Sequence, residues 1–136
     1  MLINSDADLK RLFETVKTIA VVGCSPKPER AGHYVAKYLQ DLGYRIIPVN
    51  PGQTEILGEK CYASLRDIPE PVDMVDCFRK SEDIPPIVDD AIAIGVKYIW
   101  MQLDIVNEEA AARASAAGID VVMDRCPKID YPRLFR

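Results

Sequence analysis

The stretch IAVVGCSPKPERAG, residues 19–32, decides the fold, because a short apolar run enters a glycine and then a long loop. A strand that ends at a glycine and turns toward a helix is how a Rossmann-type sheet begins. The dinucleotide fingerprint G-x-G-x-x-G would place two more glycines after Gly23, but the chain has Ser25 and Pro28 at those positions. The next glycine is Gly32. The stretch therefore predicts a strand, a lengthened loop and a helix, and the loop does not fit a standard NAD cradle.

Four more apolar runs, rich in β-branched residues, follow the first one. They span residues 45–49, 74–78, 98–101 and 119–123. Runs without polar alternation are typical of parallel strands that are buried on both faces. Helical periodicity fills most of the intervals, and Gly43, Gly95 and Gly118 are suitable helix stops.

Residues 51–71 break this alternation, and we expect a short hairpin near 55–62 and a helical turn near 64–68 there. Before the first strand, Ser5 and Asp8 fit a capping box at the start of a helix. The whole pattern predicts an α/β protein, namely a doubly wound, Rossmann-like fold with a five-stranded parallel sheet in the order 3-2-1-4-5.

Length and composition limit the function. The 136 residues fit one domain, 1–136, with 49% hydrophobic and 28% charged residues. With a net charge of −4, the protein has no overall positive potential that would attract nucleic acid. Any anionic ligand must therefore be held by a few local groups. No apolar run is long enough to span a membrane, and the N-terminal sequence lacks the regions of a signal peptide. We expect a cytoplasmic protein that binds neither membranes nor nucleic acid.

Metal and catalytic motifs are missing from the sequence. The four cysteines, Cys24, Cys61, Cys77 and Cys126, form no C-x-x-C pair, and His33 is the single histidine. This pattern predicts reduced thiols and no metal site. Neither a G-x-S-x-G elbow nor an H-E-x-x-H or Walker motif occurs, so no catalytic constellation is predicted.

In a doubly wound sheet, ligands bind beyond the carboxyl ends of the strands at the switch point, here expected between strands 1 and 4. That rule selects residues 23–32, 50–53, 78–81, 102–105 and 124–128. In the first segment Ser25 offers a hydroxyl, and Lys27 and Arg30 offer positive charge to a phosphate. A plain strand-to-helix turn with solvated charges explains the same residues.

The ends of the next strands narrow the choice of ligand. A dinucleotide site usually has a carboxylate at the end of strand 2, but here Asn50 and Pro51 follow the strand, which disfavours NAD. Phe78 and Arg79 place an aromatic ring and a cation at the end of strand 3. The alternative is that Phe78 is a core residue and Arg79 pairs with a surface acid. Arg125, after strand 5, could meet a phosphate or pair with Asp124.

Five motifs then occur in order, each at a strand end: G-x-S-x-K-P-x-R, P-V-N-P, C-F-R, W-M-Q and D-R-C-P. With the segments around them, over about residues 8–135, the chain resembles the small stand-alone CoA-binding domain proteins. These are similar to the CoA-binding Rossmann-like domain of succinyl-CoA synthetase α subunits and related acyl-CoA synthetases. The resemblance implies that the long first loop wraps the phosphates of coenzyme A. The ligase machinery of those relatives lies in other domains.

By that resemblance, the first loop, the start of its helix and the next three strand ends would hold coenzyme A or an acyl-CoA. The implied residues are Gly23, Cys24, Ser25, Lys27, Arg30, His33, Asn50, Pro51, Phe78, Arg79 and Gln102. Those of the first loop would meet the phosphates, those at the ends of strands 2 and 3 would border the adenine nucleotide, and Gln102 would lie near the pantetheine. Asp104 stands where a glycine is more usual in the family.

We therefore expect a small cytosolic protein that binds coenzyme A or an acyl-CoA through strand-end loops, without catalytic machinery of its own. A homodimer or an enzyme partner is compatible with such a module. Two alternatives stay open. One is an NADP-binding or redox-sensing Rossmann-type domain, with Lys27 or Arg30 on the 2′-phosphate. The other is an enzyme that acts on the bound CoA thiol or thioester through Cys126 or His33.

Overall fold

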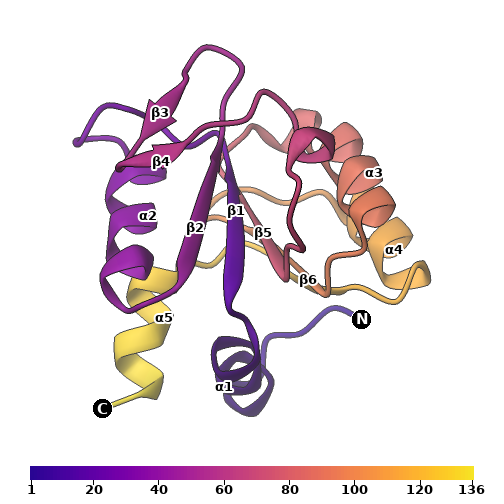
Figure 1. Cartoon of the computed structure of the whole chain (residues 1–136). Coiled ribbons are helices and arrows are strands. Elements are labelled where there is room, and N and C mark those ends of the chain that lie inside the picture. The colour runs from indigo at the N-terminus through magenta and orange to yellow at the C-terminus, as the bar shows by residue number, and fades with distance from the viewer.

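The computed structural model describes residues 1–136 and places helices on both faces of a five-stranded parallel sheet (Figure 1). The strands are β1 (Thr18–Val22), β2 (Arg45–Val49), β5 (Met74–Cys77), β6 (Tyr98–Met101) and β7 (Asp120–Val122). The helices are α1 (Asp6–Thr15), α2 (Ala31–Asp41), α3 (Ile84–Ile94), α4 (Glu108–Ala116) and α5 (Pro127–Leu134). The predicted doubly wound α/β fold with a five-stranded parallel sheet is confirmed.

The order of the strands is β2-β1-β5-β6-β7, or 2-1-3-4-5 when the five are counted along the chain. The third strand, β5, therefore pairs with β1, whereas the predicted order places it beside β2. Pro48 gives the physical reason. The carbonyl of Pro48 accepts the N–H of Tyr62 at 3.0 Å on the outer side of β2. The backbone nitrogen of Pro48 has no N–H, so Pro48 cannot donate a hydrogen bond to a further strand on that side. Such a residue suits an edge strand, and the switch point consequently lies between β1 and β5.

The connection from β2 to β5 contains the short hairpin and the helical turn that the sequence predicts. These are β3 (Glu55–Ile56), β4 (Glu59–Lys60) and the 3₁₀ turn η1 (Leu65–Asp67). After the hairpin, Tyr62 forms a parallel bridge with Val49 on the outer edge of β2. At the opposite edge of the sheet, Leu2 forms a parallel bridge with Val121 of β7. Short segments of the same chain thus occupy part of each edge of the sheet.

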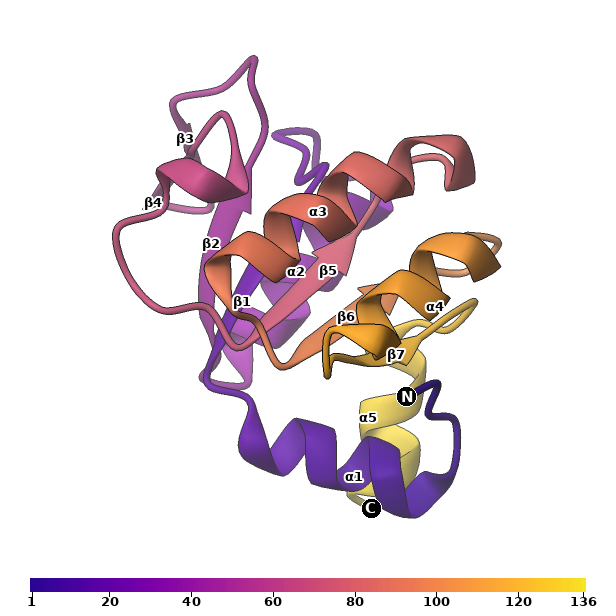
Figure 2. The ribbon, with the colours of Figure 1, turned by 90° about the vertical axis from the view of Figure 1, so that its right-hand side faces the viewer.

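Successive strand residues point to opposite faces of the sheet, and apolar side chains fill a layer on each face. One layer joins the sheet to α1 and α2 and contains Phe13, Leu39 and Trp100. The other joins it to α3 and α4 and contains Ile47 and Ile99. Figure 2 shows the second face, with α3 and α4 lying across β5, β6 and β7. In Figure 1 the strands run away from α1, so their carboxyl ends lie at the far end of the molecule from that helix.

The helix ends follow from local sequence. Ser5 caps α1 and Asn107 caps α4, each with a side-chain oxygen that accepts a backbone N–H, at 3.2 and 3.0 Å. Gly95 ends α3 in the left-handed conformation, with φ at 74°. Helix α5 is absent from the sequence prediction. Pro127 begins it, but Pro132 lies inside it and conceals the helical pattern.

None of the helices has the length and hydrophobicity that spanning a bilayer requires.

Candidate ligand-binding cleft

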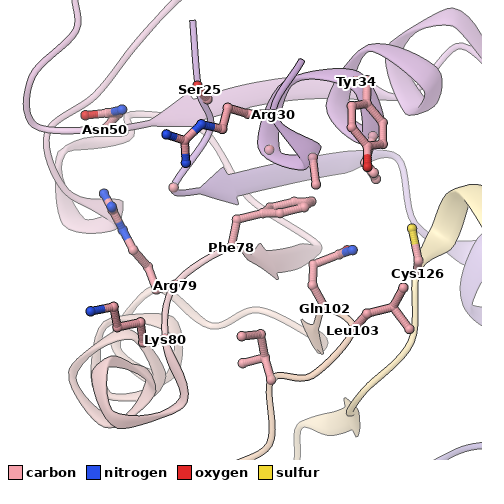
Figure 3. A pocket seen from close by; sticks show the side chains of 15 residues that line it. Ser25, Arg30, Tyr34, Asn50, Phe78, Arg79, Lys80, Gln102, Leu103 and Cys126 are labelled. Atoms are coloured by element: carbon pink, nitrogen blue, oxygen red, sulfur yellow. The ribbon is translucent and has the colours of Figure 1, made fainter. Parts of the chain in front are cut away.

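A cavity of about 550 Å³ lies at the carboxyl ends of the strands, beside the switch point (Figure 3). The β1–α2 loop, the first turn of α2 and the ends of β2, β5 and β6 form most of its wall. Its lining residues are Gly23, Ser25, Arg30, Ala31, Gly32, Tyr34, Val35, Asn50, Phe78, Arg79, Lys80, Gln102, Leu103, Ile105 and Cys126.

The structure brings seven of the predicted site residues together on this cavity: Gly23, Ser25, Arg30, Asn50, Phe78, Arg79 and Gln102. Four others do not line it. Cys24 is fully buried in the apolar layer beneath α2. Lys27 and Pro51 are exposed on their loops, and His33 is half-buried on the first turn of α2.

Eight lining residues are not among the predicted ones. Six of them lie inside the five strand-end segments that the switch-point rule selects, so their positions were available from the sequence. Tyr34 and Val35 lie outside those segments, on the first turn of α2. The family resemblance also matches Tyr34 to the helix start beneath the phosphates, whereas only the three-dimensional course of the helix brings Val35 to the cavity.

Two glycines allow three pieces of backbone to meet beside the cavity. Gly23 has a φ of 85°, and a Cβ atom on it would lie 2.6 Å from the carbonyl oxygen of Phe78. A Cβ atom on Gly32 would lie 2.6 Å from the carbonyl oxygen of Gly23. Gly32 therefore permits the close contact of helix and strand that the last glycine of a dinucleotide fingerprint permits, at the end of a longer loop.

His33 and Asn50 brace the β1–α2 loop. Nδ1 of His33 lies 2.8 Å from the carbonyl oxygen of Ser25. Nδ2 of Asn50 donates to the carbonyl of Cys24 at 3.0 Å, and its Oδ1 accepts the N–H of Gly52 at 2.9 Å. Both ends of the Asn50 amide are therefore engaged within the protein, and His33 holds the loop in place.

The cavity is cationic although the chain as a whole is acidic. Its lining contains Arg30, Arg79 and Lys80 and no carboxylate, whereas the net charge of the protein is −4. Six of the nine arginines form ion pairs, but Arg30 and Arg79 form none. The first N–H groups of α2, which begins right after Arg30, have no partner within the helix. The cleft thus concentrates positive charge and free donors, which is what an anionic group needs.

The two ends of the cavity differ in character. In Figure 3 the three cations gather on one side of Phe78. The other end is formed by Tyr34, Gln102, Leu103 and Cys126. No charged side chain lines that end. The cavity therefore suits a long ligand with anionic groups at one end and uncharged groups at the other.

The remaining candidates at the strand ends have structural partners. Trp100 is fully buried, and its Nε1 donates to the carbonyl of Arg125 at 2.7 Å. Arg125 pairs with Asp130 at 3.1 Å, so it meets neither Asp124 nor the cavity. Asp104 has a φ of 67°, in the left-handed region that favours glycine, and its N–H donates to Asp124 Oδ1 at 2.7 Å.

The four cysteines are free thiols. Burial raises the pKa of Cys24 to about 12, and it also raises the pKa of Cys61 and of Cys77. These three groups therefore stay as neutral thiols. Cys126 is the cysteine that lines the cavity. No three histidine, cysteine, aspartate or glutamate side chains are grouped so as to hold a metal ion.

Asp76 is an ionisable side chain in the middle of β5 and is fully buried. Burial raises its pKa well above the usual value for an aspartate. A carboxyl group whose pKa is raised by folding contributes its full stability below its unfolded pKa, and this contribution is lost as the pH rises through the folded pKa.

Replacing Asp76 by asparagine should therefore change how stability depends on pH. Above about pH 4, the free energy of unfolding of the unmodified protein should fall relative to Asp76→Asn, by about 1.4 kcal/mol per pH unit, until Asp76 ionises in the folded state. Urea denaturation of both proteins at about pH 4, 6 and 8 measures this difference. A constant difference across those conditions would contradict the assignment.

Fold and site together define a doubly wound α/β domain with a cationic cleft at its switch point. A family model described as a CoA binding domain matches residues 17–132. The chain belongs to this CoA-binding domain family, as the strand-end motifs predict.

Individual relatives show the same relationship. The chain is 42% identical over 127 residues to the uncharacterized protein YneT of Bacillus subtilis, covering 93% of this chain and 94% of YneT. A solved structure described as a hypothetical protein from Pyrococcus horikoshii is 41% identical, with a TM-score of 0.95, and the match covers 98% of this chain and 94% of that one. The α subunit of acetate–CoA ligase (ADP-forming) I from Pyrococcus furiosus is 36% identical over 97 residues. That match covers 67% of this chain but only 21% of the ligase subunit.

Proposed function

We propose that the protein binds coenzyme A or an acyl-CoA in this cleft and has no catalytic machinery of its own. One observation carries the proposal: the cavity of an acidic protein is lined by three cations and no carboxylate, and its two arginines have no ion-pair partners. Coenzyme A has a diphosphate and a 3′-phosphate at one end and an uncharged pantetheine arm at the other. This distribution matches the two ends of the cavity, and membership of the CoA-binding domain family supports the same ligand.

In this proposal the phosphates lie at the cationic end. Arg30, Arg79 and the first amide groups of α2 bind them, with Ser25 beside them on the loop. Phe78 lies between the two ends of the cavity and contacts the nucleotide, while the pantetheine arm extends toward Gln102. A charged hydrogen bond to phosphate stabilises a complex by about 1.5–3 kcal/mol, so two or three of them support a specific complex.

Calorimetric titration of the purified protein with coenzyme A, acetyl-CoA, NAD and NADP tests this proposal. We expect saturable binding of coenzyme A and acetyl-CoA, and binding of either dinucleotide weaker by about 100-fold or more, the equivalent of about 2.7 kcal/mol. At the end of β2, Asn50 stands where a dinucleotide site usually has a carboxylate that binds the ribose hydroxyls. Both ends of the Asn50 amide are already hydrogen-bonded within the protein, so Asn50 cannot take over that role. Binding of NADP without binding of coenzyme A would overturn the proposal.

One observation favours an enzyme instead, because the thiol of Cys126 lines the uncharged end where a thioester would lie. Acyl transfer would form a thioester on the Cys126 sulfur and release the CoA thiol, with the thiol proton of Cys126 passing to the released thiolate. The intact mass of the protein after incubation with acetyl-CoA separates the two functions. A binding module keeps its mass, whereas a gain of one acetyl group that is lost in Cys126→Ser would assign the transfer.

A further inference from the structure

Two of the three buried polar side chains of the protein contact each other at the cavity. Asp76 is fully buried and Gln102 is 6% exposed. One atom of the Gln102 amide group lies 2.7 Å from Oδ1 of Asp76 and 3.3 Å from Oδ2. Figure 3 shows the other end of this amide pointing into the cavity, at the uncharged end beyond Phe78. The same amide group therefore connects a buried carboxyl group with the ligand space.

The two ends of a glutamine amide have opposite hydrogen-bonding roles, because Oε1 only accepts and Nε2 only donates. If Asp76 is ionised, its oxygens accept only, so Nε2 of Gln102 must face it and Oε1 is left for the cavity. If Asp76 is protonated, its hydroxyl donates to Oε1, and Nε2 is left for the cavity. The proton on Asp76 thus decides whether this part of the wall offers a donor or an acceptor.

The strands around Asp76 contain no cation that would balance a negative charge. Val21 of β1 and Trp100 of β6 are its neighbours in register on either side. The titratable groups close to it are thiols, Cys24 after β1 and Cys77 next to it on β5. Burial raises the pKa of both thiols, so neither of them places a charge beside Asp76. Burial likewise raises the pKa of Asp76, which favours its neutral form.

The helices that cover this face also leave Asp76 without a cation. They bury apolar side chains against the sheet, together with the thiol of Cys126 and the partly buried rings of Tyr38 and Tyr131. Where α5 begins, Arg125 and Asp130 pair with each other at 3.1 Å.

We propose that Asp76 is a positioning residue that, in its protonated form, turns the Gln102 amide so that Nε2 donates to a carbonyl group of the bound ligand. The inference rests on the proposed function, in which the pantetheine amides or a thioester supply that carbonyl. When Asp76 is ionised, Oε1 of Gln102 faces the carbonyl and the two acceptors repel each other. Protonation and ligand binding are therefore coupled: the affinity falls as Asp76 ionises, and the ligand in turn favours the protonated form.

The first test needs no ligand. The side-chain ¹⁵N–¹H resonances of Gln102, assigned by their absence in Gln102→Glu, are followed by NMR from about pH 5 to 10, a range wide enough for a strongly raised carboxyl pKa. They should shift with a single apparent pKa in the unmodified protein. In Asp76→Asn the asparagine amide does not titrate, so the resonances should stay in one position across this pH range. Immobile resonances in the unmodified protein, or the same titration in both proteins, would overturn the inference.

The second test measures the affinity for coenzyme A by calorimetry over the same pH range in both proteins. The affinity of the unmodified protein should fall by about tenfold more than that of Asp76→Asn, because one hydrogen bond is replaced by two opposed acceptors. The ligand's own phosphate and thiol titrate equally in the two experiments, so the difference isolates Asp76. Equal pH profiles would overturn the inference. If neither protein binds coenzyme A at any pH, the proposed function fails, and the NMR titration still decides whether Asp76 turns Gln102.

Discussion

Replacing Arg30 or Arg79 by alanine should weaken the binding of coenzyme A by about 10- to 100-fold each, since a charged hydrogen bond to phosphate contributes about 1.5–3 kcal/mol. Neither arginine has an ion-pair partner in the protein, so the free energy of unfolding should change by less than about 0.5 kcal/mol. Isothermal titration calorimetry gives the affinities, and urea denaturation of the same samples gives the stabilities.

Arg11→Ala is the matched control, because it removes one positive charge from α1, at the opposite end of the molecule, where Arg11 pairs with Asp8 at 3.7 Å. It should bind coenzyme A as the unmodified protein does. If Arg30→Ala, Arg79→Ala and Arg11→Ala all have the same affinity, the two arginines do not bind the ligand. A stronger loss of affinity at low than at high salt would identify the contact as ionic.

Gly23→Ala should destabilise the protein by about 3–5 kcal/mol, a large part of the total stability of a domain this size. Two effects contribute. A left-handed backbone costs a residue with a Cβ atom about 1–2 kcal/mol. The new methyl group would in addition lie 2.6 Å from the Phe78 carbonyl oxygen, which belongs to the backbone and cannot rotate away, so that strands β1 and β5 must separate locally.

Gly118 provides a control that separates the two effects. It has the same φ as Gly23, 85°, but a Cβ atom on it would meet nothing within 4 Å. Gly118→Ala should therefore show the backbone term alone, about 1–2 kcal/mol. The difference between the two variants, measured by urea denaturation, is the cost of the close contact at the switch point. Equal destabilisation would show that β1 and β5 can move apart without cost.

Most of the fold could be predicted from local sequence, because each strand is a continuous apolar run and most helices have a recognisable cap or stop. The order of the strands is set by pairing between distant segments, which local pattern does not encode. Pro48 was the available signal, because a proline in the middle of a strand indicates an edge. Helix α5 escaped prediction for a related reason, since its interior Pro132 argues against a helix when read locally.

The candidate site could be predicted at the level of segments but only in part at the level of side chains. The rule that ligands lie beyond the carboxyl ends of parallel strands selected most of the segments that line the cavity. Position along a loop does not give the direction of a side chain, and so Cys24 lies in the core and Lys27 in solvent. Asp76 is visible in the sequence as a carboxylate inside an apolar strand, but its contact with Gln102 depends on the register of β5 and β6.

The bridges made by Tyr62 and Leu2 have a consequence for self-association. An exposed strand edge is a template on which a second chain can add its own strand and so extend the sheet across a dimer or into an aggregate. Here Tyr62 covers the carboxyl end of β2, and Leu2 covers the side of β7. A second copy of this protein therefore cannot pair with these parts of the two edges without first displacing Tyr62 or Leu2.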